Sequence, residues 1–101
     1  MNLAKMMKQA QAMQANMLAK QEELAAKDFT ASVGGGKVTA TATGNGDVRS
    51  ITIDPSVVDP SDVEFLQDLV LKAVQEAIAL GKDATAAEMK KLTGGLGIPG
   101  L

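Results

Sequence analysis

The sequence lacks most of the residues from which an active site is built. Its 101 residues contain no cysteine, histidine, tryptophan or tyrosine. The usual general base, histidine, and the most reactive nucleophile, cysteine, are therefore both missing. Without cysteine the chain forms no disulfide bond, which fits a reducing cytosol. We expect a protein that is not an enzyme, that needs no cofactor and that has no small-molecule substrate.

Aromatic residues are almost absent, since Phe29 and Phe65 are the only two. Apolar residues nevertheless make up 46% of the chain, and most of them are Ala, Val, Leu, Ile and Met. A core of such small or flexible side chains buries less apolar area per residue than an aromatic core does. A length of about 100 residues corresponds to a single domain. We therefore expect one domain whose core is completed by a second copy of the chain.

Signals for membranes, secretion and metals are also missing. No apolar run reaches the roughly 18 residues that a membrane-spanning helix needs, and the N-terminus lacks the pattern of a signal peptide. The carboxylates of Asp54, Asp59 and Asp62 lie close together in the sequence. Prolines at 55 and 60 and helix capping explain these aspartates better than a metal does, so we expect no metal site.

The first long feature is a predicted helix over residues 2–27, which contain no glycine or proline and many strong helix formers. About 26 residues make a rod of roughly 39 Å, so one end should project from a domain of this size. Apolar side chains recur with the spacing of a coiled-coil seam, which favours packing over a ligand-binding role for the methionines. The spacing includes Ala10 and Lys20, and the expected dimer or packing contacts are Leu3, Met6, Met13, Met17 and Leu24.

Three strands are predicted next, over residues 28–34, 37–44 and 48–54. Apolar and hydroxyl side chains alternate along them, as in an antiparallel meander that is covered on one face. The Asn-Gly pair within "GNGD" (44–47) predicts a tight turn with positive φ at both residues. Val48 falls out of phase with the inward-facing Ile51 and Ile53, which predicts a β-bulge near Arg49 and Ser50.

A second long helix is predicted to end near Thr93. Its start has two candidate caps, Asp59 followed by Pro60, or Ser61 with Glu64 three residues later. Gly81 interrupts the apolar pattern, although helical residues continue after it. The Gly/Pro-rich residues 94–101 are expected to form a flexible tail. The predicted fold is therefore an α+β domain of order αβββα, spanning residues 1–93.

Positive charge is concentrated at the N-terminus, although the whole chain carries a net charge of −2. All twelve carboxylates lie between Glu22 and Glu88, and residues 1–27 carry +2, from four lysines and two glutamates. Lys5 and Lys8 lie near the N-terminus of the predicted helix, where the helix dipole disfavours cations. Helix stability does not explain them, which leaves two readings, a solubilising surface or a site for a polyanion.

Four segments in this order resemble the YbaB/EbfC family of bacterial nucleoid-associated proteins: "MKQAQAMQANMLAKQEEL" (7–24), "GKVTATATGNGDVRSITID" (36–54), "DVEFLQDLVLKAVQEA" (62–77) and "MKKLTGGLGIPG" (89–100). The resemblance implies a tweezer-like homodimer that binds double-stranded DNA and alters its conformation, located on the nucleoid in the cytoplasm. It places the DNA-contacting residues on the two long helices. The matching positions here are Lys5, Lys8, Lys20, Lys82, Lys90 and Lys91.

Neither long helix contains an arginine. Lysine contacts phosphates as a point charge and reads base edges poorly, so we expect little sequence discrimination. An alternative hypothesis is an adaptor, in which the Met/Gln/Ala face of the first helix docks onto partner proteins.

Overall fold

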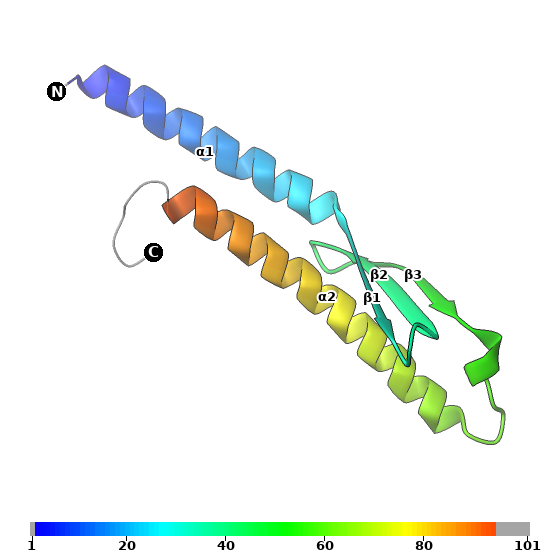
Figure 1. Ribbon diagram of the computed structural model, residues 1–101. Helices are drawn as coiled ribbons and strands as arrows, with labels where there is room; N and C mark the ends of the chain where they lie inside the picture. The colour runs from blue at the N-terminus through cyan, green and yellow to red at the C-terminus, as the bar shows by residue number, and fades with distance from the viewer. Residues whose placement is uncertain (1, 95–101) are drawn as a thin grey trace.

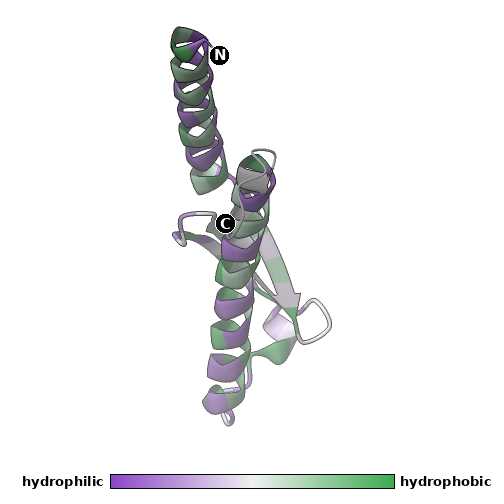
Figure 2. Ribbon diagram, turned by 90° about the vertical axis from the view of Figure 1, so that its left-hand side faces the viewer, coloured by the Kyte–Doolittle hydropathy of each residue, from purple (hydrophilic) through white to green (hydrophobic). Residues whose placement is uncertain are grey.

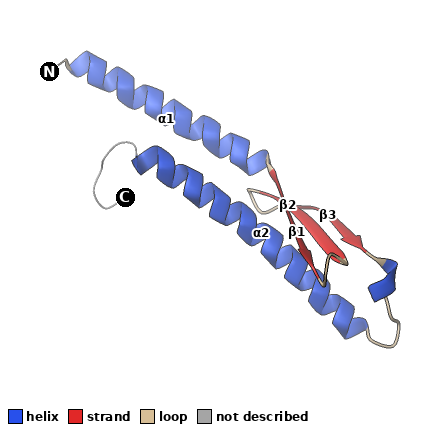
Figure 3. Cartoon of the chain, viewed as in Figure 1, coloured by secondary structure: helices blue, strands red, loops and turns tan. Residues whose placement is uncertain are grey.

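The computed structural model describes residues 2–94 and shows an elongated molecule, 72 × 23 × 16 Å, made of two long helices and one sheet (Figure 1). The three strands lie together on one side of the second helix (Figure 3). The predicted αβββα order is confirmed. The elements are α1 (Leu3–Ala26), β1 (Asp28–Val33), β2 (Val38–Thr43), β3 (Val48–Ile53), the 3-10 turn η1 (Pro55–Val57) and α2 (Val63–Gly94).

Helix α1 begins with a cap that the sequence pattern did not reveal. The Asn2 side chain accepts a hydrogen bond from the Lys5 N–H at 3.3 Å, which satisfies one of the unpaired donors of the first turn. The helix ends at Ala26, and β1 begins after the single residue Lys27. This short connection ties the direction of α1 to the edge of the sheet.

The sheet is an antiparallel meander with strand order β1-β2-β3. Thr41 pairs with Ser50, and the next pair along is Ala42 with Val48, so Arg49 is the extra residue of a β-bulge. The predicted bulge is confirmed. It returns Val48 to the face that carries Ala42, which is the face toward α2.

The second hairpin differs from its predicted geometry. Its loop has three residues, Gly44 to Gly46, closed by a hydrogen bond from the Thr43 N–H to the Asp47 carbonyl at 2.8 Å. Only Gly46 has positive φ, at 90°, while Asn45 does not. A type I turn followed by one left-handed residue is the usual geometry of a three-residue hairpin loop. The expectation of two positive-φ residues was therefore wrong.

The start of α2 also differs from the prediction. The cap is Asp62, whose carboxylate accepts the Phe65 N–H at 3.2 Å. The Asp59 carboxylate instead accepts hydrogen bonds from both the N–H and the hydroxyl of Ser61, in a turn that precedes the helix. Neither predicted cap is used. Gly81 does not interrupt α2, which runs unbroken to Gly94. The predicted flexible tail lies outside the described residues, apart from Gly94.

The core lies between α2 and the first two strands. Its fully buried helix residues, Ala73 and Ala77, pack against small apolar residues of β1 and β2. Strand β3 is mostly uncovered. Ile51, predicted to face inward, does share the helix-facing side with its partner Ala40, yet its side chain is 43% exposed. The protomer therefore leaves apolar surface without a cover at the third strand. The other buried residues of this core are Ala31, Val33, Val38, Ala40 and Ala42.

Candidate nucleic-acid interface

The base of α1 is fixed by the β2–β3 loop. The Gly44 N–H donates to the Lys27 carbonyl at 3.0 Å, and the Asn45 N–H donates to the Ala25 carbonyl at 3.3 Å. These bonds satisfy carbonyls at the C-terminal end of α1, which helices otherwise leave unpaired. Leu24 is buried at the same junction. The β2–β3 loop thus anchors the C-terminal end of α1.

The other half of α1 projects freely. The N-terminal end of α1 extends past the end of α2 in both views (Figures 1 and 2). Leu3 and Met6 of the predicted seam are 69% and 46% exposed, whereas Met13 and Met17 are half-buried. Apolar segments recur along the projecting part in Figure 2. Within one protomer, only Leu24 of the predicted seam is fully covered.

Lys5 and Lys8 lie on this projecting end. They are one helical turn apart, so their side chains share one face of α1. Both are exposed, and in the described part of the chain neither forms an ion pair. The nearest acidic residue along the helix is Glu22. The tip of α1 is therefore a cationic surface whose charge is not neutralised by the described residues.

Lys20 and Lys91 are brought together by one carboxylate. Glu88 of α2 places one oxygen 3.8 Å from the Lys20 ammonium and the other 3.3 Å from the Lys91 ammonium. Lys20 also lies 3.6 Å from Glu23 on its own helix. Residues that are 68 positions apart in the sequence thus meet where the two helices pass each other. Lys91 lies three residues after Glu88 on the same helix, but no spacing in the sequence predicts the contact of Glu88 with Lys20.

Two further candidate lysines lie elsewhere on α2. Lys82 is exposed and follows Gly81, which is packed against the sheet rather than near the end of α2. Lys90 is exposed close to the C-terminal end of the helix. The six candidate lysines therefore divide into a tip (Lys5 and Lys8), a junction (Lys20 and Lys91) and two further positions on α2.

The three loop aspartates have local partners. Hydrogen bonds from the Ser56 N–H and hydroxyl, with the Lys37 ammonium at 3.3 Å, hold the pKa of Asp54 below its usual value. The Ser61 hydroxyl and N–H do the same for the pKa of Asp59. A lowered carboxyl pKa stabilises the fold at pH values above its unfolded pKa of about 3.9. That stabilisation is lost as the pH falls through the folded value.

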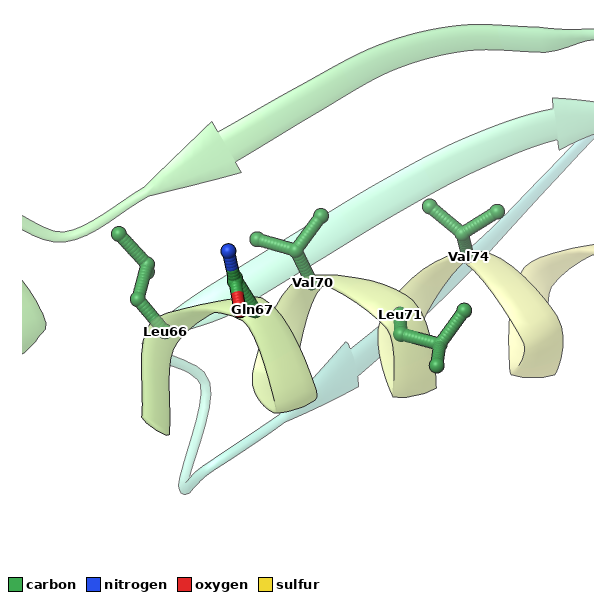
Figure 4. A pocket seen from close by; sticks show the side chains of 5 residues that line it. All are labelled: Leu66, Gln67, Val70, Leu71 and Val74. Carbon is green, nitrogen blue, oxygen red and sulfur yellow. The ribbon is translucent and has the colours of Figure 1, made fainter. Parts of the chain in front are cut away.

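A second surface feature lies beside β3. Leu66, Val70, Leu71 and Val74 of α2, with Gln67, line an open groove of about 420 Å³. Val70 and Val74 point toward the sheet, while Leu71 points away from it (Figure 4). The groove lies on the helix next to the strand that α2 leaves uncovered. An apolar surface of this kind is typical of a contact with another protein chain.

Comparison with known proteins shows the family of the chain. The model of the YbaB/EbfC DNA-binding family matches residues 1–96. The chain belongs to the YbaB/EbfC DNA-binding family. It is 56% identical to a nucleoid-associated protein of Akkermansia muciniphila, over 98% of this chain and 95% of that protein. It is 54% identical to a nucleoid-associated protein of Clostridium novyi, over 100% of this chain and 89% of that one.

Solved structures support the fold independently. The crystal structure of an uncharacterized protein from Helicobacter pylori superimposes with a TM-score of 0.62, covering 95% of this chain and 97% of that chain at 22% identity. The YbaB/EbfC family is a DNA-binding family and not a family of enzymes, and the adaptor hypothesis is not favoured. Within the described residues, neither helix is both long and apolar enough to cross a membrane.

Proposed function

We propose that this YbaB/EbfC protein binds double-stranded DNA as a homodimer, organises the bacterial nucleoid in the cytoplasm and regulates gene expression by altering DNA conformation. The observation that carries the proposal is the pair Lys5 and Lys8, exposed on a projecting rod and separate from the acidic body. Relatives named nucleoid-associated proteins supply the location. Lys20, Lys82, Lys90 and Lys91 are the further DNA-contacting candidates.

Binding through such lysines is an interaction with phosphates. Each lysine that neutralises a phosphate releases condensed counterions, which supplies affinity without reading sequence. A dimer would present two cationic tips, and DNA that contacts both would have to follow their spacing. Because the β2–β3 loop anchors the base of each α1, the protein could impose that spacing on the duplex.

The DNA-binding proposal is tested with several unrelated duplexes of equal length. Fluorescence anisotropy at low salt should give dissociation constants that agree within a few-fold, because phosphate contacts carry no sequence information. Failure to bind any duplex at low salt would overturn the proposal. Strong preference for one duplex would show that base edges are read, contrary to the lysine mechanism.

The homodimer is supported by surfaces that one protomer leaves open. The helix-facing side of β3 exposes Val48 and Ile51, and the apolar groove on α2 lies next to it. The seam residues Leu3 and Met6 are open as well. Covering these surfaces with a second copy would complete a core that contains few aromatic side chains, as the composition suggests.

Replacing Ile51 by lysine should separate the dimer into monomers. Ile51 and Thr52 lie on opposite faces of β3, so I51K places a charge on the open apolar face and T52K places one on the hydroxyl face. Burying an unpaired ammonium is strongly unfavourable, so we expect the dimer dissociation constant of I51K to rise by about 100-fold or more. Sedimentation velocity measures this, with T52K as the matched control. Monomeric wild type at micromolar concentration, or equal behaviour of both variants, would exclude this interface.

A further inference from the structure

Ion pairs between lysines and glutamates lie where the two helices pass each other. Its cations are Lys20 and Lys91, and its carboxylates are Glu23 and Glu88. Of these groups, Glu88 alone touches both lysines, with a different oxygen on each. The Lys20 and Glu88 side chains are 32% and 33% exposed, so water screens their interaction less than it screens a fully exposed pair.

The tip of α1 differs from the junction because its lysines are not paired with carboxylates of the described residues. Lys5 and Lys8 are exposed and have no carboxylate partner among the described residues. A phosphate can approach them without displacing another anion. At the junction, a Glu88 oxygen already lies beside each ammonium, so an approaching phosphate is repelled by a like charge and competes with it for the lysine. The carboxylate is thus an internal competitor of DNA phosphate.

We infer that Glu88 is an autoinhibitory residue that pairs with Lys20 and Lys91 and so weakens the contact of these two lysines with DNA. The inference rests on the proposed DNA binding and adds to it a limit on affinity and on the length of DNA that each protomer contacts. Of the six lysines that the family resemblance indicates, the two at the junction then contact DNA only weakly while Glu88 pairs with them. A change that removes the Glu88 charge releases Lys91 and leaves Lys20 with Glu23 as its single carboxylate partner among the described residues.

The variant Glu88→Gln tests this inference directly. Glutamine has nearly the shape of glutamate but no charge, so Lys91 becomes available to phosphate and Lys20 is held by Glu23 alone. The plot of log binding constant against log salt should steepen by about 0.9 for each lysine released, or up to about 1.8 per protomer. Affinity at low salt should rise between about twofold and thirtyfold, the range spanned by two ion pairs of ordinary strength.

The matched control is Glu22→Gln. Glu22 is an exposed carboxylate of α1 that forms no ion pair among the described residues, so E22Q makes the same change in net charge without releasing a lysine. A steeper slope for E88Q than for E22Q, with unchanged thermal unfolding, supports the inference. Equal slopes for the two variants overturn it, because Glu88 would then act only through net charge or as a brace between helices. If wild type fails to bind DNA, the proposed function itself fails.

Discussion

Reversing the charges of Lys5 and Lys8 together should reduce affinity for double-stranded DNA by about a hundredfold or more at 0.1 M salt. A dimer would lose four phosphate contacts, and each such contact releases about 0.9 of a counterion. The four new glutamates would also repel the duplex. Anisotropy titrations of the K5E/K8E variant against wild type measure the loss, which should be the same on unrelated duplexes.

The fold should survive this change. Both positions are exposed and lie near the N-terminus of α1, where the helix dipole favours acidic side chains by a few tenths of a kcal/mol. Circular dichroism should therefore show equal or slightly higher stability for K5E/K8E. Lys72→Glu is the charge control, because Lys72 is exposed on α2 next to the buried Ala73 of the core. If K72E weakens binding as much as K5E or K8E alone, the tip is not the DNA-contacting surface.

Replacing Gly44 by alanine should destabilise the fold by about 3 kcal/mol or more, the upper range for forced overpacking. A Cβ at this position would overlap the Leu24 carbonyl group of α1. Relieving the overlap would pull the hairpin loop from the helix end and break the bonds to the Lys27 and Ala25 carbonyls. Urea unfolding measures the change in free energy.

Two further variants give the scale for this prediction. Asn45→Ala alters an exposed side chain in the same loop and should change stability by no more than about 0.5 kcal/mol. Gly81→Ala should lie between the two. Its Cβ would be 3.2 Å from the Gly44 Cα and the Thr43 carbonyl, but alanine regains about 1 kcal/mol of helix propensity. If G44A proves as stable as N45A, the β2–β3 loop does not anchor the C-terminal end of α1.

The order and type of the elements could be predicted because each depends on local periodicity. The phase of Val48 against Ile51 even predicted a bulge near Arg49 and Ser50, and the structure makes Arg49 its extra residue. The caps were harder, because Asp59, Ser61 and Asp62 all suit the role and only the path of the chain selects Asp62. Likewise, the loop geometry at Asn45 follows from docking on α1, which no pattern within "GNGD" contains.

The candidate site was predictable only in part, for a similar reason. The concentration of lysine at the start of α1 is visible in the sequence, and so is the projection of a long rod. The partnership of Lys20 with Glu88 depends on where α1 and α2 pass each other, which a linear sequence does not show. In the sequence, Gly81 interrupts the apolar pattern of a helix. In the structure, it is the residue at which α2 packs closely against the sheet.

The central claim is that exposed lysines on a projecting helix hold DNA by its phosphates, although the protein as a whole is acidic. The most direct test is the binding constant of the wild-type dimer for one duplex, measured from 50 to 200 mM salt. The account predicts a straight line in log binding constant against log salt, with a slope of about −3.6 if the four tip lysines make the contacts. A slope near zero would contradict it, because binding would then not depend on the release of counterions from phosphates.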